Sequence, residues 1–418
     1  MAGSGITSSC SSGVHSAVSP GSIAPGAIGH SCDVSSHPPG VLMLSYQYWP
    51  MADGGAERQA QRLAEGLAAR GWRIGVVTAR YPGLPRFEKL NGVDVYRIWA
   101  IPRPGKFSAT FLPSLMRFLV SRGRDYTIWH AHQAFYHAAI AVSVGRWMRR
   151  LCIVKAAASG PYGDMARLRR VRMGGWVVRS LREADAIISL NAELTEELVH
   201  AGFNSSRVRR IPNGVDCTQF TIPSAGSRYH ARQELGIGAD ELLAVFAGRL
   251  AEDKGVDFLL EAWRIIEQRF PTRPWKLILV GNELRQGEYQ ARLRQLRSAR
   301  HFGKVSDVRP FLRAADLVVH PSLAEGLSNV VLEAMATGVP VVGTRVGGLN
   351  EQIDDRVSGL LVEPASPFAL VEGLLVLLEN AALRVNLGEQ ARSRAEQVYS
   401  LDSVISAYER LYQELHGA

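Results

Sequence analysis

From Val41 onward, short apolar runs rich in β-branched residues alternate with longer amphipathic stretches. This alternation is typical of βαβ units, in which helices join parallel strands and cover both faces of the sheet. The chain of 418 residues also exceeds the size at which a single hydrophobic core stops growing. The sequence therefore predicts two α/β domains, each with its own parallel sheet.

The first series of apolar runs forms the expected N-terminal domain, residues 41–215. One amphipathic stretch, residues 56–70, has an apolar face at helical spacing and stops at Gly71, which suits the left-handed turn that ends a helix. Strands are expected at residues 41–46, 74–79, 93–98, 127–131, 152–158 and 186–190.

A second series follows a stretch bearing Pro, Ser and Gly at residues 221–228, and it forms the expected C-terminal domain, residues 216–398. The last segment, residues 399–418, has a helical pattern and is expected to pack across the domain boundary. Strands of the second domain are expected at residues 242–247, 276–280, 317–320, 339–343 and 359–362.

Residues 1–40 differ in composition from the rest of the chain. Ser, Gly, Pro and Ala dominate, and charged residues are almost absent. Such a segment cannot bury enough apolar surface to offset the entropy of ordering it, so it is predicted to be a disordered tail. It also lacks the basic start and apolar core of a secretion signal.

The overall composition disfavours several classes of protein. No run of about 18 apolar residues occurs, which argues against a membrane-spanning helix. The net charge of +9 admits nucleic acid, an anionic membrane or phosphorylated ligands as partners. The cysteines have neither the density of a disulfide framework nor the spacing of a zinc site, which favours a reducing cytoplasm; they are Cys10, Cys32, Cys152 and Cys217.

The most informative stretch is HPSLAEGLSNVVLEAMATGVPVV at residues 320–342. An apolar run that predicts a buried strand ends there, Glu325 and Gly326 lie in the following loop, and a helix is expected at residues 328–338. A carboxylate and several backbone amides therefore meet at a helix N-terminus on the carboxyl side of a strand. Sheets of α/β proteins bind anions and other ligands at such positions.

Glu325 and Glu333 stand eight positions apart, and the stretch resembles the E-x7-E signature of the family-4 retaining glycosyltransferases. The resemblance extends over most of the chain from Val41 to the C-terminal helix. It implies the GT-B fold, in which two Rossmann-like domains face a central cleft. It also implies that Glu333 holds the ribose hydroxyls of a nucleotide sugar and that Glu325 lies beside the donor sugar and its phosphates. The same donor site would be lined by the amides of Gly326, Leu327, Ser328 and Asn329.

A second motif, FAGRLAEDKG at residues 246–255, follows the first expected strand of the C-terminal domain. Transfer from a nucleotide sugar requires the leaving diphosphate to be neutralised by a metal ion or by fixed cations. Arg249 and Lys254 match the residues that perform this role in the family. Only six of the 48 basic residues are lysines, so a lysine at this position is a specific match.

The metal alternative has its own sequence signature. Metal-dependent glycosyltransferases commonly hold a divalent ion with an Asp-x-Asp pair, and no two aspartates in this chain are two positions apart. We therefore expect no metal and no cofactor, with a nucleoside-diphosphate sugar as the co-substrate.

Gly54 and Gly55 follow the first expected strand and open the first helix. Glycines at this place allow the backbone to approach a donor phosphate or sugar closely, and they match the family's glycine-rich turn. The turn has no G-x-G-x-x-G pattern, which disfavours a dinucleotide-dependent oxidoreductase.

The fourth expected strand ends in WHAHQ at residues 129–133, and strand alternation sends His130 and His132 to one face. The family carries a histidine near the donor sugar at the second of these positions. His132 is therefore a candidate catalytic residue, and His130 is a candidate on the acceptor side. The alternative is that these histidines are structural.

Three further candidates for the acceptor side follow the fifth expected strand: Ser159, Gly160 and Tyr162. Residues 211–216 resemble the family's hinge turn between the two domains. The chain departs from the family at residues 300–304, where a more apolar strand is usual.

Together these residues predict a retaining, metal-independent hexosyltransferase that acts on a glycan, a lipid-linked acceptor or another hydroxyl group, as in polysaccharide biosynthesis. One alternative is a sugar-nucleotide epimerase or phosphorylase of the same fold. Another is a non-catalytic nucleotide-sugar-binding assembly partner. Nucleic acid is not expected as a partner, because no recognised nucleic-acid-binding module is present.

Two segments of the N-terminal half, residues 106–124 and 165–182, combine large apolar residues with cations. An amphipathic basic segment can lie in the interface of an anionic leaflet. The sequence therefore predicts a cytoplasmic protein with peripheral attachment to the inner membrane face. The alternative for the first segment is an ordinary core helix packed through Phe111, Leu115 and neighbouring apolar residues.

Overall fold

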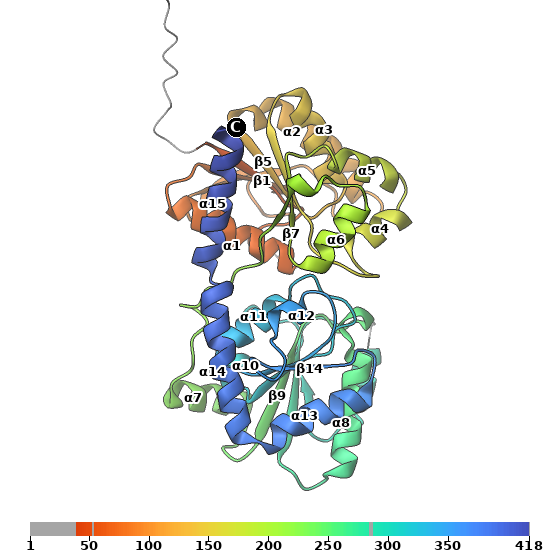
Figure 1. The fold of residues 1–418 in the computed structure, drawn as a ribbon, viewed down its shortest axis with the longest axis vertical. Helices are drawn as coiled ribbons and strands as arrows, with labels where there is room; N and C mark the ends of the chain where they lie inside the picture. The colour runs from red at the N-terminus through yellow and green to blue at the C-terminus, as the bar shows by residue number, and fades with distance from the viewer. Residues whose placement is uncertain (1–38, 52–53, 284–286, 418) are drawn as a thin grey trace, which may run out of the picture. The chain divides into compact units, whose positions relative to one another are not determined.

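The computed structural model describes residues 39–51, 54–283 and 287–417. The predicted tail at residues 1–40 lies outside the described residues except for its last two. The described residues belong to one compact unit, whose elements are labelled in Figure 1.

The N-terminal half forms a sheet with strands β1 (Val41–Leu44), β2 (Ile74–Ala79), β3 (Phe87–Leu90), β4 (Val93–Ile98), β5 (Ile128–His132), β6 (Leu151–Lys155), β7 (Ala186–Ser189) and β8 (Val208–Arg210). Within the described residues, their order is β3-β4-β2-β1-β5-β6-β7-β8. All neighbours pair in parallel except β3, which pairs antiparallel with β4. The helices of this half are α1 (Gly55–Ala69), α2 (Phe107–Ser121), α3 (Tyr136–Trp147), α4 (Asp164–Arg170), α5 (Gly174–Leu181) and α6 (Ala192–His200).

The C-terminal half forms a parallel sheet with strands β9 (Leu242–Ala247), β10 (Trp275–Val280), β11 (Ala299–His301), β12 (Leu317–His320), β13 (Val341–Thr344) and β14 (Leu360–Val362). Its described strands stand in the order β11-β10-β9-β12-β13-β14. The helices are α7 (Ala225–Leu235), α8 (Val256–Arg269), α9 (Glu288–Leu293), α10 (Arg309–Ala314), α11 (Asn329–Ala336), α12 (Leu349–Gln352), α13 (Pro367–Glu379), α14 (Ala381–Val398) and α15 (Leu401–Gly417).

Apolar residues dominate the central strands because the connecting helices cover both faces of each sheet. Every residue of β1, β5 and β12 is buried. This is the pattern of parallel sheets in doubly wound proteins. The two sheets confirm the predicted α/β class with two Rossmann-like domains.

The C-terminal segment returns from the second sheet to the first (Figure 1). Helix α14 packs on α11, and α15 packs on α1. Ser400 lies between α14, which packs on the C-terminal half, and α15, which packs on the N-terminal half. Around it, Val215 N–H donates to Tyr399 O and Leu401 N–H donates to Val215 O. Tyr408 and Tyr412 of α15 are buried against the first sheet's core.

The strands that the sequence did not predict lie at sheet edges. β3 and β8 are the two edge strands of the first sheet and β11 is an edge strand of the second. They carry the sequences FEKL, VRR and ARH and leave side chains partly exposed. An edge strand pairs with only one other strand and is partly exposed to solvent. Its sequence therefore lacks the continuous apolar run by which a central strand is recognised.

The amphipathic segment at residues 106–124 folds mainly as α2, and its apolar face packs inward. Phe111, Leu115 and Leu119 are buried in the hydrophobic core of the N-terminal half. The structure therefore favours the core-helix alternative for this segment. Across the described residues, we find no helix with the length and apolar character needed to cross a membrane.

Candidate active site

The order of the strands indicates where each sheet is expected to bind a ligand. The first strand of each half, β1 or β9, has its successor on one side and a later strand, β5 or β12, on the other. Doubly wound sheets bind ligands at such a switch point, beyond the carboxyl ends of the strands. Gly54 follows β1, His132 ends β5, Arg249 follows β9 and Glu325 follows β12. Residues far apart in the sequence thereby meet at one place.

A cavity of about 330 Å³ lies between these strand ends. We call it the inner cavity. It brings together nine of the residues predicted from the sequence: Gly54, Gly55, His132, Arg249, Lys254, Glu325, Leu327, Ser328 and Asn329.

The carboxylate of Glu325 is the centre of a polar cluster in the inner cavity. Its Oε1 accepts hydrogen bonds from Lys254 Nζ, from His320 Nε2 at 2.8 Å and from Ser322 Oγ at 3.1 Å. Burial raises the pKa of this carboxyl, but Lys254 and His320 more than offset that effect, and the pKa lies well below its usual range. Glu325 is therefore ionised at neutral pH and holds Lys254 in place.

Arg249 has a carboxylate partner as well. Its Nη2 lies 3.1 Å from Asp253 Oδ2. The guanidinium remains largely exposed to solvent, so this pair is weakly held and can exchange for a ligand oxygen. Both predicted diphosphate-binding cations thus line the inner cavity, each beside an acidic side chain.

His132 is buried, and neither of its ring nitrogens has a hydrogen-bond partner among the described residues. Burial holds the pKa of His132 well below the ordinary value, and the nearby His130 and Lys155 lower it further. The ring is therefore neutral and offers one donor and one acceptor. A sugar hydroxyl can pair with one of them.

The loop before α11 supplies fewer free amides than the sequence predicted. Ser328 N–H donates to Gln352 Oε1 at 2.8 Å, so this amide is already satisfied within the protein. Gly326 packs against the other half, where an added Cβ would lie 1.9 Å from Ala157 O. Asn329 begins α11, and the first amide of a helix has no partner inside that helix.

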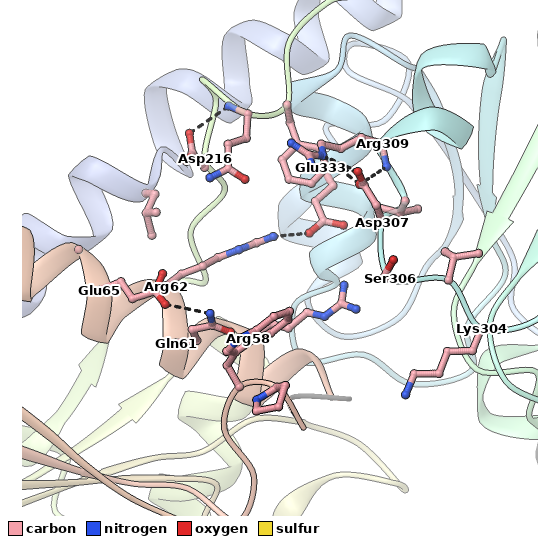
Figure 2. Close-up of a pocket in the computed structure, with 18 residues that line it drawn as sticks. Arg58, Gln61, Arg62, Glu65, Asp216, Lys304, Ser306, Asp307, Arg309 and Glu333 are labelled. Atoms are coloured by element: carbon pink, nitrogen blue, oxygen red, sulfur yellow. Dashed lines mark hydrogen bonds and ion pairs between the residues drawn. The ribbon is translucent and has the colours of Figure 1, made fainter. Parts of the chain in front are cut away.

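Glu333, the predicted ribose-binding residue, lines a larger neighbouring cavity of about 940 Å³. We call this the outer cavity. Arg62 of α1 reaches across it and pairs with Glu333, with Nη2 2.7 Å from Oε1 (Figure 2). Arg58 and Lys304 extend into the same space. A carboxylate accepts several hydrogen bonds. Glu333 can therefore bind ribose hydroxyls while it stays paired with Arg62, or the hydroxyls can displace Arg62.

A third space of about 260 Å³ joins the other two. It shares Gly54 and Arg249 with the inner cavity and shares Arg58 and Glu333 with the outer one. The three spaces therefore adjoin one another between Glu325 and Glu333, with Arg249 shared by two of them.

Four candidates for the acceptor side do not line the inner cavity. His130 Nδ1 bonds to the buried Tyr412 hydroxyl at 2.7 Å, and this pair fixes α15 to the sheet. Gly160 N–H donates to Glu197 at 2.6 Å. Ser159 is buried and Oγ donates to Glu325 O at 3.4 Å, whereas Tyr162 is exposed. The geometry gives His130 a structural role, as the sequence left open.

Two titratable residues of the inner cavity, His320 and Lys155, were not predicted as site residues from the sequence. His320 orients Glu325, and its position directly before the E-x7-E loop was a usable signal. Lys155 ends β6, and a lysine after an apolar run looks like an ordinary strand end. Among the described residues, no three His, Cys, Asp or Glu side chains are grouped so that they would hold a metal ion.

The fold and this site define a GT-B glycosyltransferase. Models of two families match: glycosyltransferase family 4 over residues 53–219 and glycosyl transferases group 1 over residues 241–380. The chain belongs to the family-4, group 1 glycosyltransferases. Family membership favours glycosyl transfer over the epimerase and phosphorylase alternatives.

Relatives and solved structures agree with this assignment. A D-inositol 3-phosphate glycosyltransferase of Corynebacterium jeikeium is 33% identical over 90% of this chain and 97% of its own length. An uncharacterized glycosyltransferase of Methanocaldococcus jannaschii is 29% identical over 89% of this chain and 97% of its own length. The Anabaena protein HepE in complex with UDP-glucose has a TM-score of 0.75 at 21% identity, covering 91% of this chain and 100% of that one.

Proposed function

We propose that this glycosyltransferase moves a sugar from a nucleoside-diphosphate sugar to a hydroxyl acceptor, with retention at the anomeric carbon and without a metal ion. The observation that carries the proposal is the inner cavity, where Arg249, Lys254, Glu325 and His132 surround one space. The joined cavities fit a donor whose sugar lies beside Glu325 and His132, whose diphosphate passes Arg249, and whose ribose reaches Glu333.

The proposed reaction breaks the bond between the anomeric carbon and the β-phosphate oxygen. The acceptor oxygen bonds to the same face of that carbon, and its proton passes to the leaving phosphate. Arg249 and Lys254 stabilise the negative charge that develops on the diphosphate. Glu325 is a poor candidate for a covalent nucleophile because Lys254, His320 and Ser322 donate to its Oε1 and so lower the nucleophilicity of the whole carboxylate.

We expect activity to survive a metal chelator. The chain has no Asp-x-Asp pair, and two fixed cations lie where the diphosphate would leave. A panel of nucleotide sugars is incubated with the purified protein in excess EDTA, and release of the nucleoside diphosphate is measured. Complete loss of turnover in EDTA, restored by Mn²⁺ or Mg²⁺, would show that a metal performs this role instead.

We also propose peripheral attachment to an anionic membrane face, with a lipid-linked glycan as the acceptor class. The support is the α4–α5 segment of the N-terminal half, where Met173 and Trp176 are 61% and 41% exposed. Exposed arginines surround them: Arg167, Arg169, Arg170, Arg172 and Arg179. Each cation near an anionic surface contributes about 1 kcal/mol to binding.

Liposome co-sedimentation tests this attachment. Binding is expected to require anionic lipid, to weaken as salt is raised, and to fall in the double variant Met173→Ser, Trp176→Ser. The control is Trp99→Ser, which removes an exposed tryptophan outside this segment. If the wild-type protein does not sediment with anionic liposomes at low salt, it does not attach through this surface.

A further inference from the structure

Lysine is rare in this chain, yet three of its six lysines line the cavities of the site: Lys155, Lys254 and Lys304. Lys155 comes from the N-terminal sheet. It is the last residue of β6 and stands opposite His132 in the parallel pairing of β5 and β6. Only 6% of its surface is exposed, and it lines the inner cavity together with Lys254 and Glu325.

The partners of Lys155 carry no negative charge. Its Nζ donates to Asn213 Oδ1 at 2.9 Å and lies 5.7 Å from the centre of the Tyr408 ring. Across the described part of the chain, no carboxylate forms an ion pair with it. A buried ammonium without a counter-ion is costly, and lysines are almost never fully buried unless they are paired. The cavity therefore holds an amine that has no counter-ion when it is protonated.

Asn213 fixes the position of this cation relative to the other half of the protein. Its Nδ2 donates to Asn329 Oδ1 at 3.2 Å, and Asn329 is the first residue of α11. Asn329 Nδ2 in turn donates to Gly55 O at 3.0 Å. The amine of Lys155 is thus connected through Asn213 to the N-terminus of α11 and, through Asn329, to the glycine turn; Asn329 and Gly55 both line the inner cavity.

The charges in the inner cavity show why this cation matters. Lys254 is paired with Glu325, and Arg249 is paired with Asp253. These two cations therefore bring two acidic side chains with them. Lys155 contributes a positive charge that no described acidic side chain offsets, and a nucleoside-diphosphate sugar brings two negative charges to the same place.

We propose that Lys155 binds the diphosphate of the donor from the N-terminal half, while Arg249 and Lys254 bind it from the C-terminal half. This inference rests on the proposed function. The amine would donate to a phosphate oxygen while Asn213 keeps it oriented. Lys155 would then be a donor-binding residue that also favours contact between the two halves of the protein.

Burial lowers the pKa of Lys155 to about 7, so the empty site holds a mixture of charged and neutral amine at neutral pH. A bound diphosphate favours the charged form and raises this pKa. Binding should therefore take up part of a proton. Three neighbouring groups do not titrate in this range: burial holds the pKa of His130 at about 3, keeps that of His132 well below its ordinary value, and raises that of Tyr408.

The test is isothermal titration calorimetry with UDP, GDP and ADP in EDTA, near neutral pH, in two buffers of different ionisation enthalpy. We expect Lys155→Met to weaken binding of the preferred nucleotide by about tenfold or more, as for the loss of a charged hydrogen bond. We also expect the variant to take up fewer protons than the wild type. Lys89→Met, an exposed lysine of β3, is the matched control and should bind as the wild type does.

Thermal unfolding of Lys155→Met checks that the variant is folded, and methionine fills the same buried space without a charge. If the wild type binds a nucleotide and Lys155→Met matches it in affinity and proton uptake, this inference is wrong while the proposed function stands. If the wild type binds none of the three nucleotides, the proposed function and this inference both fail.

Discussion

Replacing Lys254 or Arg249 by alanine is expected to lower turnover of the donor by about two orders of magnitude or more, the effect of losing one preorganised charge-stabilising group. The diphosphate gains negative charge as the glycosidic bond breaks, so the loss acts on the transition state more than on the bound donor. Donor affinity should therefore change less than kcat.

The two substitutions are expected to differ in size of effect, because the two cations differ in burial. Lys254 is held by Glu325 and is mostly buried, whereas Arg249 is largely exposed beside Asp253. A buried, oriented cation interacts more strongly with developing charge than an exposed one. We expect Lys254→Ala to be the more damaging of the two.

Steady-state kinetics on a donor that the wild type turns over provides the measurement. Arg264→Ala is a matched control, because Arg264 forms an exposed pair with Glu261 on α8 of the same half. The control should retain wild-type kcat. Wild-type turnover in both Lys254→Ala and Arg249→Ala would remove these residues from the mechanism.

Replacing Glu325 by glutamine is expected to reduce both turnover and stability. The carboxylate receives hydrogen bonds from Lys254, His320 and Ser322, and an amide oxygen cannot balance the lysine's charge. Removing one partner of a fully buried ion pair costs about 3–5 kcal/mol. Because the Lys254 side chain keeps 17% exposure, we expect roughly half of that cost.

A loss of about 2 kcal/mol lowers the midpoint of thermal unfolding by roughly 4–8 °C in a domain of this size. Turnover should fall by about a hundredfold, since Lys254 loses the group that orients it. Glu363→Gln is the control, because Glu363 is 72% exposed and lies 3.7 Å from Arg345. Exposed pairs of this kind contribute at most about 1 kcal/mol.

The pH dependence of this destabilisation follows from the direction of the pKa shift. The pKa of Glu325 is lower in the folded protein than in the unfolded chain, where it is about 4.3. Its contribution to stability is therefore fully present above about pH 5 and is lost as the pH falls through the folded pKa. The difference in the free energy of unfolding between wild type and Glu325→Gln should be constant from neutral pH down to about pH 5 and should shrink below that pH. A constant difference at all pH values would contradict the proposed role of the charge.

The sequence was sufficient for the central strands and for the first glycine turn. Strands such as β1, β5 and β9 are buried on both faces, so their apolar runs are visible without any knowledge of partners. The edge strands β3, β8 and β11 were missed because they are partly exposed to solvent and carry polar residues, which interrupt the apolar pattern. Helix α11 begins one residue after its cap, Ser328, close to where the sequence placed its start.

Contacts between the two halves could not be predicted from one sequence. Arg62 and Glu333 are separated by 271 positions, and nothing local to either residue indicates their pairing. The same is true of Asn213 and Asn329, which are separated by 116 positions. These contacts depend on how two sheets approach one another. Local periodicity does not encode that approach.

Lys155 shows most clearly what could not be predicted from the sequence. A lysine that follows an apolar run is consistent with a strand end that reaches solvent. Only the neighbouring strand β5 and helix α15, which contributes Tyr408, turn this position into a buried wall of the inner cavity. The chemistry of the residue was visible in the sequence, but its surroundings were not.

The anomeric configuration of the first-formed product tests the central claim most directly. Wild-type protein, a nucleotide sugar that it turns over and excess EDTA are followed by proton NMR, and the coupling of the new anomeric proton is read before mutarotation or further reaction. We predict the configuration of the donor, as expected for attack on the face that the diphosphate leaves. A product of inverted configuration would contradict retaining transfer at this site.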